Sequence, residues 1–460
     1  MSLRTAKTTE RPFPARFVAP LLWGSSLNPV NSSIIATSLV AIGTAFGVSA
    51  GQTATLVAAV YVASAVAQPA MGRLGAQFGA RRVFLVGLGV VTIAGVVGAF
   101  APTFGWLIVS RALIGIGTAA GYPTAMALIR ARADEAGTGI PGSVLGGISI
   151  AAQTTAALGL PLGGLLVGVW GWPAAFAVNI PLGIVGILMA VLWVPADAPR
   201  ERTPLRDLVG ALDLLGMALF AAAVITLIAF LTDVRHPEWW YLAGFVVAVA
   251  ALAVWELRAA HPFIDLRMLG RNRPLVRTYL RQALALMASY TVLYGYVQWL
   301  EEGRGLPASI SGLVMLPMSV VAAVGAGVIS RRALVRGPLI VSGVGIILGG
   351  AALTLVTGGT NILLLIGLSL VFGVVMGMTS TSNQAALYTQ TTAEQIGVAS
   401  GLARTASYLG AIFASALIAL AFPGHATDSG LHTAAFVIVG AGVVVLLLVL
   451  LDRRLPWRGH

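Results

Sequence analysis

Arginines, amides and tyrosines set inside long apolar stretches are the residues of this chain that could do chemistry. Arg111, Arg281 and Arg404 each fall within such a stretch. A guanidinium inside a membrane span costs about 2.5–3.5 kcal/mol on insertion scales, so it usually faces a hydrated cavity or a partner. For Arg111 the alternative is a side chain that reaches the outer membrane surface. Arg404 could equally lie at the cytoplasmic interface, because it is close to the start of its stretch.

Uncharged polar residues in the same stretches suit binding better than catalysis. Tyr290, Tyr294 and Gln298 are spaced at i, i+4 and i+8, which places them on one stripe of a helix. Aromatic rings with hydrogen-bonding tips suit large apolar or amphipathic ligands. For each residue alone, hydrogen bonding between helices is the alternative. The predicted cavity residues are Asn28, Asn31, Ser32, Tyr61, Gln68, Arg111, Tyr122, Gln153, Tyr290, Tyr294, Gln298 and Arg404.

The common catalytic motifs are absent from the sequence. There is no cysteine, so the chain has no disulfide, thiolate metal site or iron–sulfur cluster. Lys7 is the only lysine, which excludes a Walker A phosphate loop. The five histidines lie in loops or at the ends of stretches, and no HExxH or GxSxG motif occurs. We predict no enzyme activity, no metal and no cofactor.

The composition indicates an integral membrane protein. Of the 460 residues, 58% are hydrophobic and only 10% are charged, with a mean hydropathy of +0.91. A soluble globular protein carries roughly 25% charged residues. The net charge of +12 comes from arginines scattered between apolar stretches rather than clustered on one face. That pattern favours loops beside anionic lipid and argues against a nucleic-acid partner.

Fourteen apolar stretches, each long enough to span a bilayer as a helix, run from end to end of the chain. They cover residues 17–46, 53–72, 83–101, 105–128, 142–168, 174–194, 209–232, 239–257, 276–299, 309–329, 338–358, 361–384, 399–421 and 432–451. Charged segments divide them into six, two and six. The predicted units are a tail (1–16), a six-helix bundle (17–194), a linker (195–208), a two-helix insert (209–257), a linker (258–275), a second six-helix bundle (276–452) and a tail (453–460).

Arginine placement predicts the orientation. With fourteen spans and a cytoplasmic N-terminus, 23 of the 28 basic residues fall in cytoplasmic segments, and the outer loops keep only Arg235 and Arg304. Positive residues favour the cytoplasmic side of bacterial membranes. Both termini are therefore predicted to be cytoplasmic, in a multi-pass protein of the bacterial inner membrane. Two six-helix halves suggest a transporter built from repeats, with a solute site between them.

The segment after the second stretch resembles the loop signature of the major facilitator superfamily, Gly-x-Leu-Ala-Asp-Arg-x-Gly-Arg-Arg/Lys-Arg. Ala76 and Gln77 replace its Asp and following Arg. Five positions match: Gly72, Leu74, Gly79, Arg81 and Arg82. The resemblance implies a conformational latch here, weakened by the loss of the acid. The alternative is a basic turn that only fixes topology.

Two further motifs and the flanks of several stretches carry the same resemblance. Arg111 to Gly115 is similar to Arg-x-x-Gln-Gly, with Ile114 for Gln, and residues 159–164 are similar to the antiporter signature Gly-Pro-x-x-Gly-Gly. Residues 171–183, 261–267 and 397–402 look like the fourteen-helix drug:proton antiporter branch. The resemblance implies an all-α major facilitator fold with two pseudo-symmetric six-helix bundles around a central cavity. It also implies a seal made by Gly159, Pro161, Gly163 and Gly164.

The family's arginine at Arg111 is associated with proton coupling and substrate binding, often together with a carboxylate. Here no Asp or Glu occurs between Arg11 and Ala133, and the helix 1 position that often carries Leu-Asp reads Leu27-Asn28. Asparagine cannot titrate, so coupling would need another carboxylate or charge on the substrate, or transport would be facilitated diffusion. Asp213, Glu256, Glu301 and Glu302 are expected at the membrane interface.

The sequence therefore predicts a monomeric secondary transporter that exports hydrophobic or amphiphilic drug-like compounds by alternating access, with proton coupling left open. Its partners would be a small-molecule substrate, membrane lipids and, if coupled, protons. The first alternative is a carrier for an anionic solute or a lipid-like anion, since three arginines lie inside stretches and the first six stretches lack an acid. The second is a membrane sensor that binds without transport.

Overall fold

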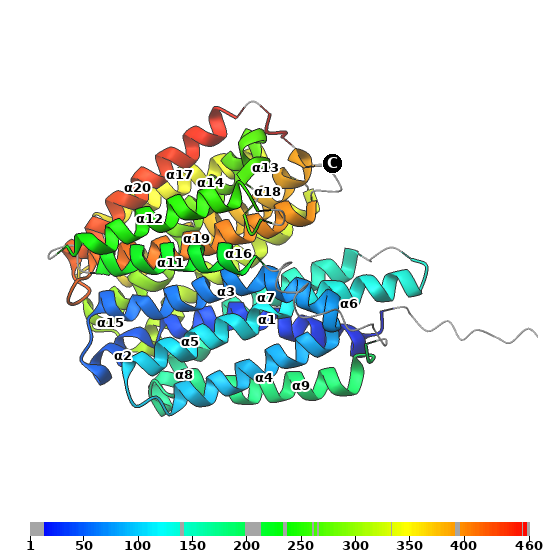
Figure 1. The fold of residues 1–460 in the computed structure, drawn as a ribbon. Coiled ribbons are helices and arrows are strands. Elements are labelled where there is room, and N and C mark those ends of the chain that lie inside the picture. The colour runs from blue at the N-terminus through cyan, green and yellow to red at the C-terminus, as the bar shows by residue number, and fades with distance from the viewer. Residues whose placement is uncertain are drawn as a thin grey trace, which may run out of the picture.

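The chain folds into helices that run side by side in two layers. The computed structural model describes residues 13–138, 142–197, 213–232, 237–259, 262–264, 266–332, 334–391, 396–452 and 454–457. Within these ranges the elements are helices, and the long ones lie roughly parallel (Figure 1). The predicted tails and linkers lie partly outside the described residues.

The first half of the chain forms the lower layer in Figure 1. Its helices are α1 (Ala15–Ala36), α2 (Leu39–Phe46), α3 (Ala50–Phe78), α4 (Ala80–Ala99), α5 (Phe104–Ala119), α6 (Gly121–Glu135), α7 (Gly142–Trp170), α8 (Ala174–Ala177) and α9 (Asn179–Trp193). We call this set the N-half. Helices α1 and α2 form one apolar stretch that bends by 58° at a short break.

The last part of the chain forms the upper layer, which we call the C-half. Its helices are α14 (Arg273–Tyr290), η1 (Thr291–Tyr296), α15 (Val297–Glu302), α16 (Ala308–Arg332), α17 (Arg336–Leu353), α18 (Ile362–Gln390), α19 (Ile396–Ala421) and α20 (Asp428–Leu450), preceded by the short α13 (Leu266–Arg271). The segment η1 is a π-helix between α14 and α15, so these three elements make one continuous rod. A π-helical turn inside an α-helix is rare and is frequently found at functional sites.

Two helices between the halves, α11 (Leu214–Thr232) and α12 (Trp239–Glu256), form the insert. Helix α11 packs on α3 of the N-half and on α19 of the C-half, so the insert covers the seam between them. Asp213 and Glu256, expected at the membrane interface, are 7% and 1% exposed. Asp213 accepts hydrogen bonds from the Gly216 backbone N–H at 3.0 Å and from the Trp255 indole at 2.6 Å, which ties the two helices together.

The predicted spans coincide with helices throughout the described chain. Twelve helices are long and apolar enough to cross a membrane, and the bent pair α1–α2 makes a thirteenth. The remaining predicted span is the rod from α14 to α15, which carries Arg273, Arg277 and Arg281 near its start. These charges make the rod less apolar than the other predicted spans. It is the first span of the C-half, as the bent pair α1–α2 is the first span of the N-half.

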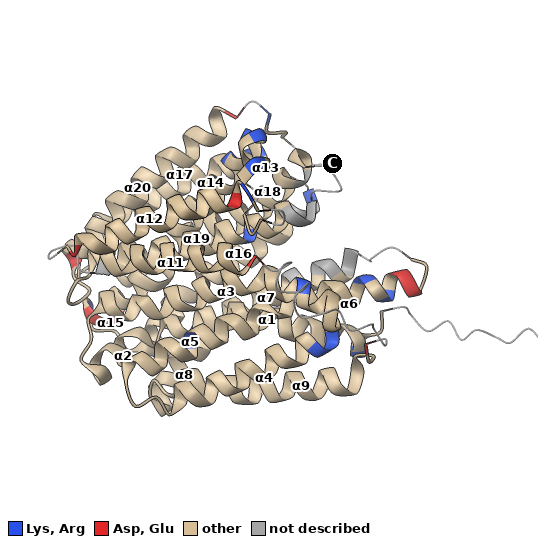
Figure 2. Ribbon diagram, in the orientation of Figure 1, with Lys and Arg blue, Asp and Glu red and all other residues tan. Residues whose placement is uncertain are grey.

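The halves meet mainly through two helix pairs, α7 with α16 and α3 with α19. Lys and Arg residues gather at the end of the molecule where α1 begins and residues 454–457 lie, which we call the basic end (Figure 2). Helices α2, α8 and α15 mark the opposite end. Both ends of the described chain thus lie on the same side of the bundle, as an even number of crossings requires.

Candidate functional site

Four tyrosines from both halves meet at the centre of the interface, and we call them the tyrosine cluster: Tyr61 of α3, Tyr290 of α14, Tyr294 of η1 and Tyr408 of α19. The hydroxyls of Tyr61 and Tyr294 are 3.0 Å apart. The Tyr61 ring lies 5.4 Å from that of Tyr290 and 5.8 Å from that of Tyr408, and Tyr290 stacks on Tyr294 at 5.8 Å. Such offset aromatic contacts form a rigid apolar wall with polar tips.

Two polar contacts extend the cluster toward the basic end, and each joins the halves. The Tyr408 hydroxyl donates to Gln68 Oε1 of α3 at 2.5 Å. The guanidinium carbon of Arg404, in α19, lies 4.1 Å from the centre of the Tyr122 ring, in α6, which is a cation–π contact. Arg404 is therefore engaged with the opposite half.

Arg111 lies inside the N-half and does not reach the membrane surface. Its side chain is 1% exposed, so the outward-reaching alternative is wrong. Its Nε donates to the Leu56 carbonyl at 3.1 Å, whereas its buried Nη2 has no hydrogen-bond partner. In the part of the chain that the structure describes, no carboxylate forms an ion pair with Arg111. Its charge is thus only partly compensated.

The amides of α1 bind other helices of the N-half. Asn28 Nδ2 donates to Ser64 Oγ at 3.2 Å and to Thr118 Oγ1 at 3.0 Å. Asn31 Nδ2 donates to Asn179 Oδ1 at 2.7 Å and to a carbonyl of its own helix. Ser32 donates to the Asn28 carbonyl. These contacts favour the alternative of interhelical hydrogen bonding for the two asparagines over direct contact with a substrate.

Of the predicted cavity residues Gln298 and Gln153, the structure describes the side chain of Gln298 only. Gln298 of α15 is completely buried, and neither its Oε1 nor its Nε2 has a hydrogen-bond partner. It follows Tyr294 by four residues on the same rod. A buried amide without partners costs free energy comparable to lost hydrogen bonds, so it marks a place where a polar ligand group would be favoured. The side chain of Gln153 lies outside the described residues.

The predicted latch loop contains an acid that comes from far along the chain. The carboxylate of Asp197, after α9, accepts the backbone N–H groups of Arg81 at 3.1 Å and Arg82 at 3.0 Å, so it caps α4. Gly79 has φ of +104°, and a Cβ there would collide with the Asp197 carboxylate. Gly72 is less constrained, because the nearest atom to an added Cβ would be Pro123 Cβ at 3.7 Å. The sequence shows only that the motif's own Asp is absent at Ala76.

The glycines predicted as a seal pack against two different helices. A Cβ on Gly159 would lie 2.6 Å from Ser33 Cβ, and one on Gly163 would lie 2.6 Å from Thr37 Oγ1, both at α1. A Cβ on Gly164 would lie 2.6 Å from the carbonyl oxygen of Ala308, which is in α16 of the other half. Pro161 lies between these positions inside α7. Close approach of helices through small residues is typical of membrane bundles.

Beyond Gly164, the halves are joined at the end opposite the basic end by backbone groups. The first N–H groups of α3, at Ala50 and Gly51, donate to the carbonyls of Gly424 and Phe422 just after α19, both at 2.9 Å. Ser415 of α19 donates to the Ala54 carbonyl at 2.5 Å. The N-terminus of one helix therefore docks on the C-terminus of another, which satisfies groups that helix ends leave unpaired. Sequence patterns gave no sign of this junction.

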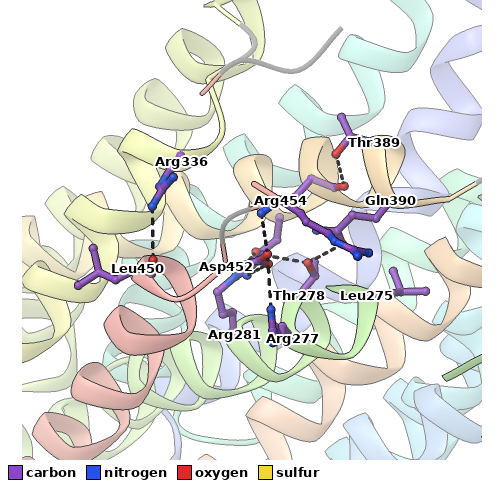
Figure 3. A network of polar contacts seen from close by, with 12 residues as sticks. Leu275, Arg277, Thr278, Arg281, Arg336, Thr389, Gln390, Leu450, Asp452 and Arg454 are labelled. Atoms are coloured by element: carbon purple, nitrogen blue, oxygen red, sulfur yellow. Dashed lines mark hydrogen bonds and ion pairs between the residues drawn. The ribbon is translucent and has the colours of Figure 1, made fainter. Parts of the chain in front are cut away.

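Arg281 has partners that the sequence analysis missed (Figure 3). Its Nη1 lies 3.4 Å from Asp452 Oδ2, its Nη2 donates to Thr278 Oγ1 at 2.8 Å, and its Nε donates to Asn383 Oδ1 at 3.3 Å. Arg281 and Asp452 are both completely buried, and Arg277 adds a second ion pair at 3.7 Å. This arginine is therefore part of the packing of the C-half, at its basic end.

No group of three His, Asp or Glu side chains in the described ranges could hold a metal ion. The polar groups of the interface are tyrosine hydroxyls, amides and two guanidinium groups. They can orient and bind a small molecule.

Comparison with known proteins agrees with this architecture. The family model described as Major Facilitator Superfamily matches residues 21–415. The chain belongs to the major facilitator superfamily. The transporter is 31% identical over 443 residues to the MFS-type transporter YwoD of Bacillus subtilis (strain 168), which covers 94% of this chain and 96% of that protein.

Some relatives of the transporter are named for resistance. It is 30% identical to the lincomycin resistance protein of Streptomyces lincolnensis, over 93% of this chain and 89% of that protein. It is 28% identical to the tetracenomycin C resistance and export protein of Streptomyces glaucescens, over 91% and 77%. In fold, it matches the nucleoside transporter NupG with a TM-score of 0.66 at 12% identity, covering 95% of this chain and 100% of NupG.

Proposed function

We propose that this transporter exports hydrophobic or amphiphilic aromatic compounds from the cell by alternating access. The observation that carries the proposal is the tyrosine cluster, in which the Tyr61 hydroxyl of the N-half meets the Tyr294 hydroxyl of the C-half at 3.0 Å. Aromatic walls with a few hydrogen-bonding tips suit drug-like ligands. A relative named for tetracenomycin C resistance and export, and another named for lincomycin resistance, support export of drug-like compounds.

In this mechanism the two halves rock about the cluster, and the contacts at each end form and break in turn. The end with α2, α8 and α15 is joined by backbone hydrogen bonds and by the close approach of Gly164 to α16. At the basic end, the halves touch through Arg404 with Tyr122 and through Tyr408 with Gln68. A substrate that enters between these side chains replaces contacts between the halves with contacts to itself.

Proton coupling, if present, would need a carrier other than a helix 1 carboxylate. Asn28 occupies that position and donates to Ser64 and Thr118. The transport assay is therefore run with and without an imposed pH gradient, so that flux and coupling are measured together.

The test is accumulation of a neutral aromatic dye, Nile red or 2-naphthol, in cells that express the wild type, Tyr294→Ala or Tyr241→Ala. Tyr241 lies in α12, where its ring contacts that of Trp240, away from the cluster, so it is the matched control. Expression of the wild type or Tyr241→Ala is expected to lower accumulation several-fold, and Tyr294→Ala to restore it to the level of cells without the transporter. Equal accumulation with and without wild-type protein for both dyes would contradict the proposal.

A further inference from the structure

Two arginines in the described part of the chain are buried in protein, and they differ in how their charge is compensated. Arg281 is 0% exposed and Arg111 is 1% exposed. Removing a guanidinium from water is costly unless an opposite charge or hydrogen bonds replace the lost hydration. The groups that replace the hydration of each guanidinium therefore indicate whether it is paired within the protein or is available to a ligand.

Arg281 is compensated by the protein. Asp452 Oδ2 lies 3.4 Å from its Nη1, and Thr278 Oγ1 accepts from its Nη2 (Figure 3). Asn383 Oδ1 accepts from its Nε. Every nitrogen of this guanidinium has a partner within the C-half.

Arg111 is compensated only in part. Its Nε donates to the Leu56 carbonyl at 3.1 Å, and its Nη2 is buried with no partner. The stretch from residue 12 to residue 133 contains no Asp or Glu, so the first five helices and most of α6 cannot supply a carboxylate. Among the described residues, the phenols of Tyr294 and Tyr61 interact with the guanidinium electrostatically. A phenol has no formal charge at neutral pH.

The surroundings of the tyrosine cluster add donors. Gln298, one turn along the rod from Tyr294, is completely buried with its Nε2 and Oε1 both unpartnered. Arg404 adds a second cation on the side of the cluster toward the basic end. The described polar groups around the cluster therefore offer positive charge and N–H donors, together with flat aromatic faces.

We propose that Arg111 is the anchor of a site for planar aromatic anions, with the carboxylate or phenolate of the ligand on its free Nη2 and the rings against Tyr61, Tyr290 and Tyr294. The ligand supplies the negative charge that the N-half lacks, and the tyrosines select a flat apolar body. This ligand class refines the export function proposed above and rests on it. Lipophilic cations, which need a carboxylate in the site, bind poorly.

The test compares three probes of one shape: 2-naphthoate, neutral 2-naphthamide and cationic 2-naphthylmethylammonium. Binding to the purified full-length protein is measured by equilibrium dialysis in phosphatidylcholine nanodiscs, so no anionic lipid headgroup competes. Because a hydrogen bond to a charged group adds roughly 1.5–3 kcal/mol, naphthoate is expected to bind about tenfold or more tightly than naphthamide, with the cation weakest.

Substitution identifies the anchor. Arg111→Gln is expected to make naphthoate and naphthamide bind equally, and Arg111→Lys to keep part of the preference. Arg304→Gln, in the loop after α15, removes the same charge elsewhere and is expected to leave the preference unchanged. If Arg111→Gln does not fold, the wild-type comparison still decides, because equal binding of naphthoate and naphthamide, or preference for the cation, overturns the site. An anion preference that persists in folded Arg111→Gln also overturns it.

The binding assay is independent of flux, so the two proposals can fail separately. Anion-selective binding without export in cells would overturn the proposed function and leave the site standing. Export of Nile red or 2-naphthol by a protein that binds naphthoate and naphthamide equally would overturn the site and leave the proposed function standing.

Discussion

The guanidinium of Arg404 lies over the face of the Tyr122 ring, 4.1 Å from its centre, and the two residues belong to opposite halves of the transporter. A cation–π contact of this kind contributes about 0.5–2 kcal/mol. Because the contact spans the interface, it stabilises the arrangement of the halves that the structure describes. In the proposed mechanism it breaks when the halves separate at the basic end.

Replacing Tyr122 tests that relationship. Tyr122→Leu removes the ring face and is expected to reduce the rate of dye export about threefold to tenfold, by shifting the balance between the two access states. Tyr122→Phe keeps the ring and is expected to stay within about twofold of the wild type. Export rates are measured in inverted vesicles at matched protein levels. A normal rate for Tyr122→Leu would exclude the contact from the transport cycle.

Gly164 and Gly168 lie on the same helix but differ in the space available for a side chain. Both lie on α7, but a Cβ on Gly164 would be 2.6 Å from the Ala308 carbonyl oxygen and 2.9 Å from Ser309 Cα, whereas a Cβ on Gly168 would have no atom within 4 Å. The obstructing atoms are backbone, which cannot move aside as a side chain would. Gly164→Val is therefore expected to keep the halves apart at this end, and Gly168→Val to be tolerated.

Separation of the halves can be measured with a single thiol, because the chain has no cysteine. Ser415→Cys places that thiol at a buried position of α19 that contacts the Ala54 carbonyl of α3. Labelling of this cysteine by a membrane-impermeant maleimide is expected to rise at least about fivefold in the Gly164→Val background, relative to Gly168→Val. Equal labelling in the two backgrounds would show that close packing at Gly164 does not hold this end closed.

Two ion pairs with the same separation test the effect of burial. Arg281 and Asp452 are 3.4 Å apart with both side chains at 0% exposure, and Arg132 and Glu135 are 3.4 Å apart with side chains at 35% and 68% exposure. Asp452→Asn leaves a buried guanidinium without an opposite charge and is expected to destabilise the protein by about 3–5 kcal/mol. Glu135→Gln should cost no more than about 1 kcal/mol, as exposed pairs do. Unfolding of the purified protein in detergent measures both, and similar losses would contradict a structural role for Asp452.

The sequence predicted the helices well, because an apolar stretch long enough to cross lipid has few alternatives to a helix. It predicted the partners of polar residues poorly. Arg281 was recognised as a charge inside a helix, but its acid, Asp452, is 171 residues away, and Asp197 caps α4 from a distance of 116 residues. Contacts of this range depend on how the helices pack, which local spacing does not encode.

Local spacing also failed to predict the exact geometry of the stripe formed by Tyr290, Tyr294 and Gln298. A spacing of four assumes α-helical geometry, but residues 291–296 form the π-helix η1, in which each turn is wider. Tyr290 and Tyr294 still stack, while Tyr294 reaches across the interface to Tyr61. Tyr61, Tyr290 and Tyr294 of the cluster were therefore predicted from the sequence, whereas Tyr408 and the pairing of hydroxyls across the halves were not.

The predicted orientation in the membrane depends on arginine placement, and on the position of both ends of the described chain at the same end of the bundle. Gly359 lies in the exposed loop between α17 and α18, and Arg454 is exposed after α20, at the basic end. In intact cells, an impermeant maleimide is expected to label Gly359→Cys and to leave Arg454→Cys unlabelled until the membrane is permeabilised. Gly359 is a safe position for the probe, since a Cβ there would meet no atom within 4 Å. The reverse labelling pattern would invert the topology, and it would make the end that carries α2, α8 and α15 the cytoplasmic one.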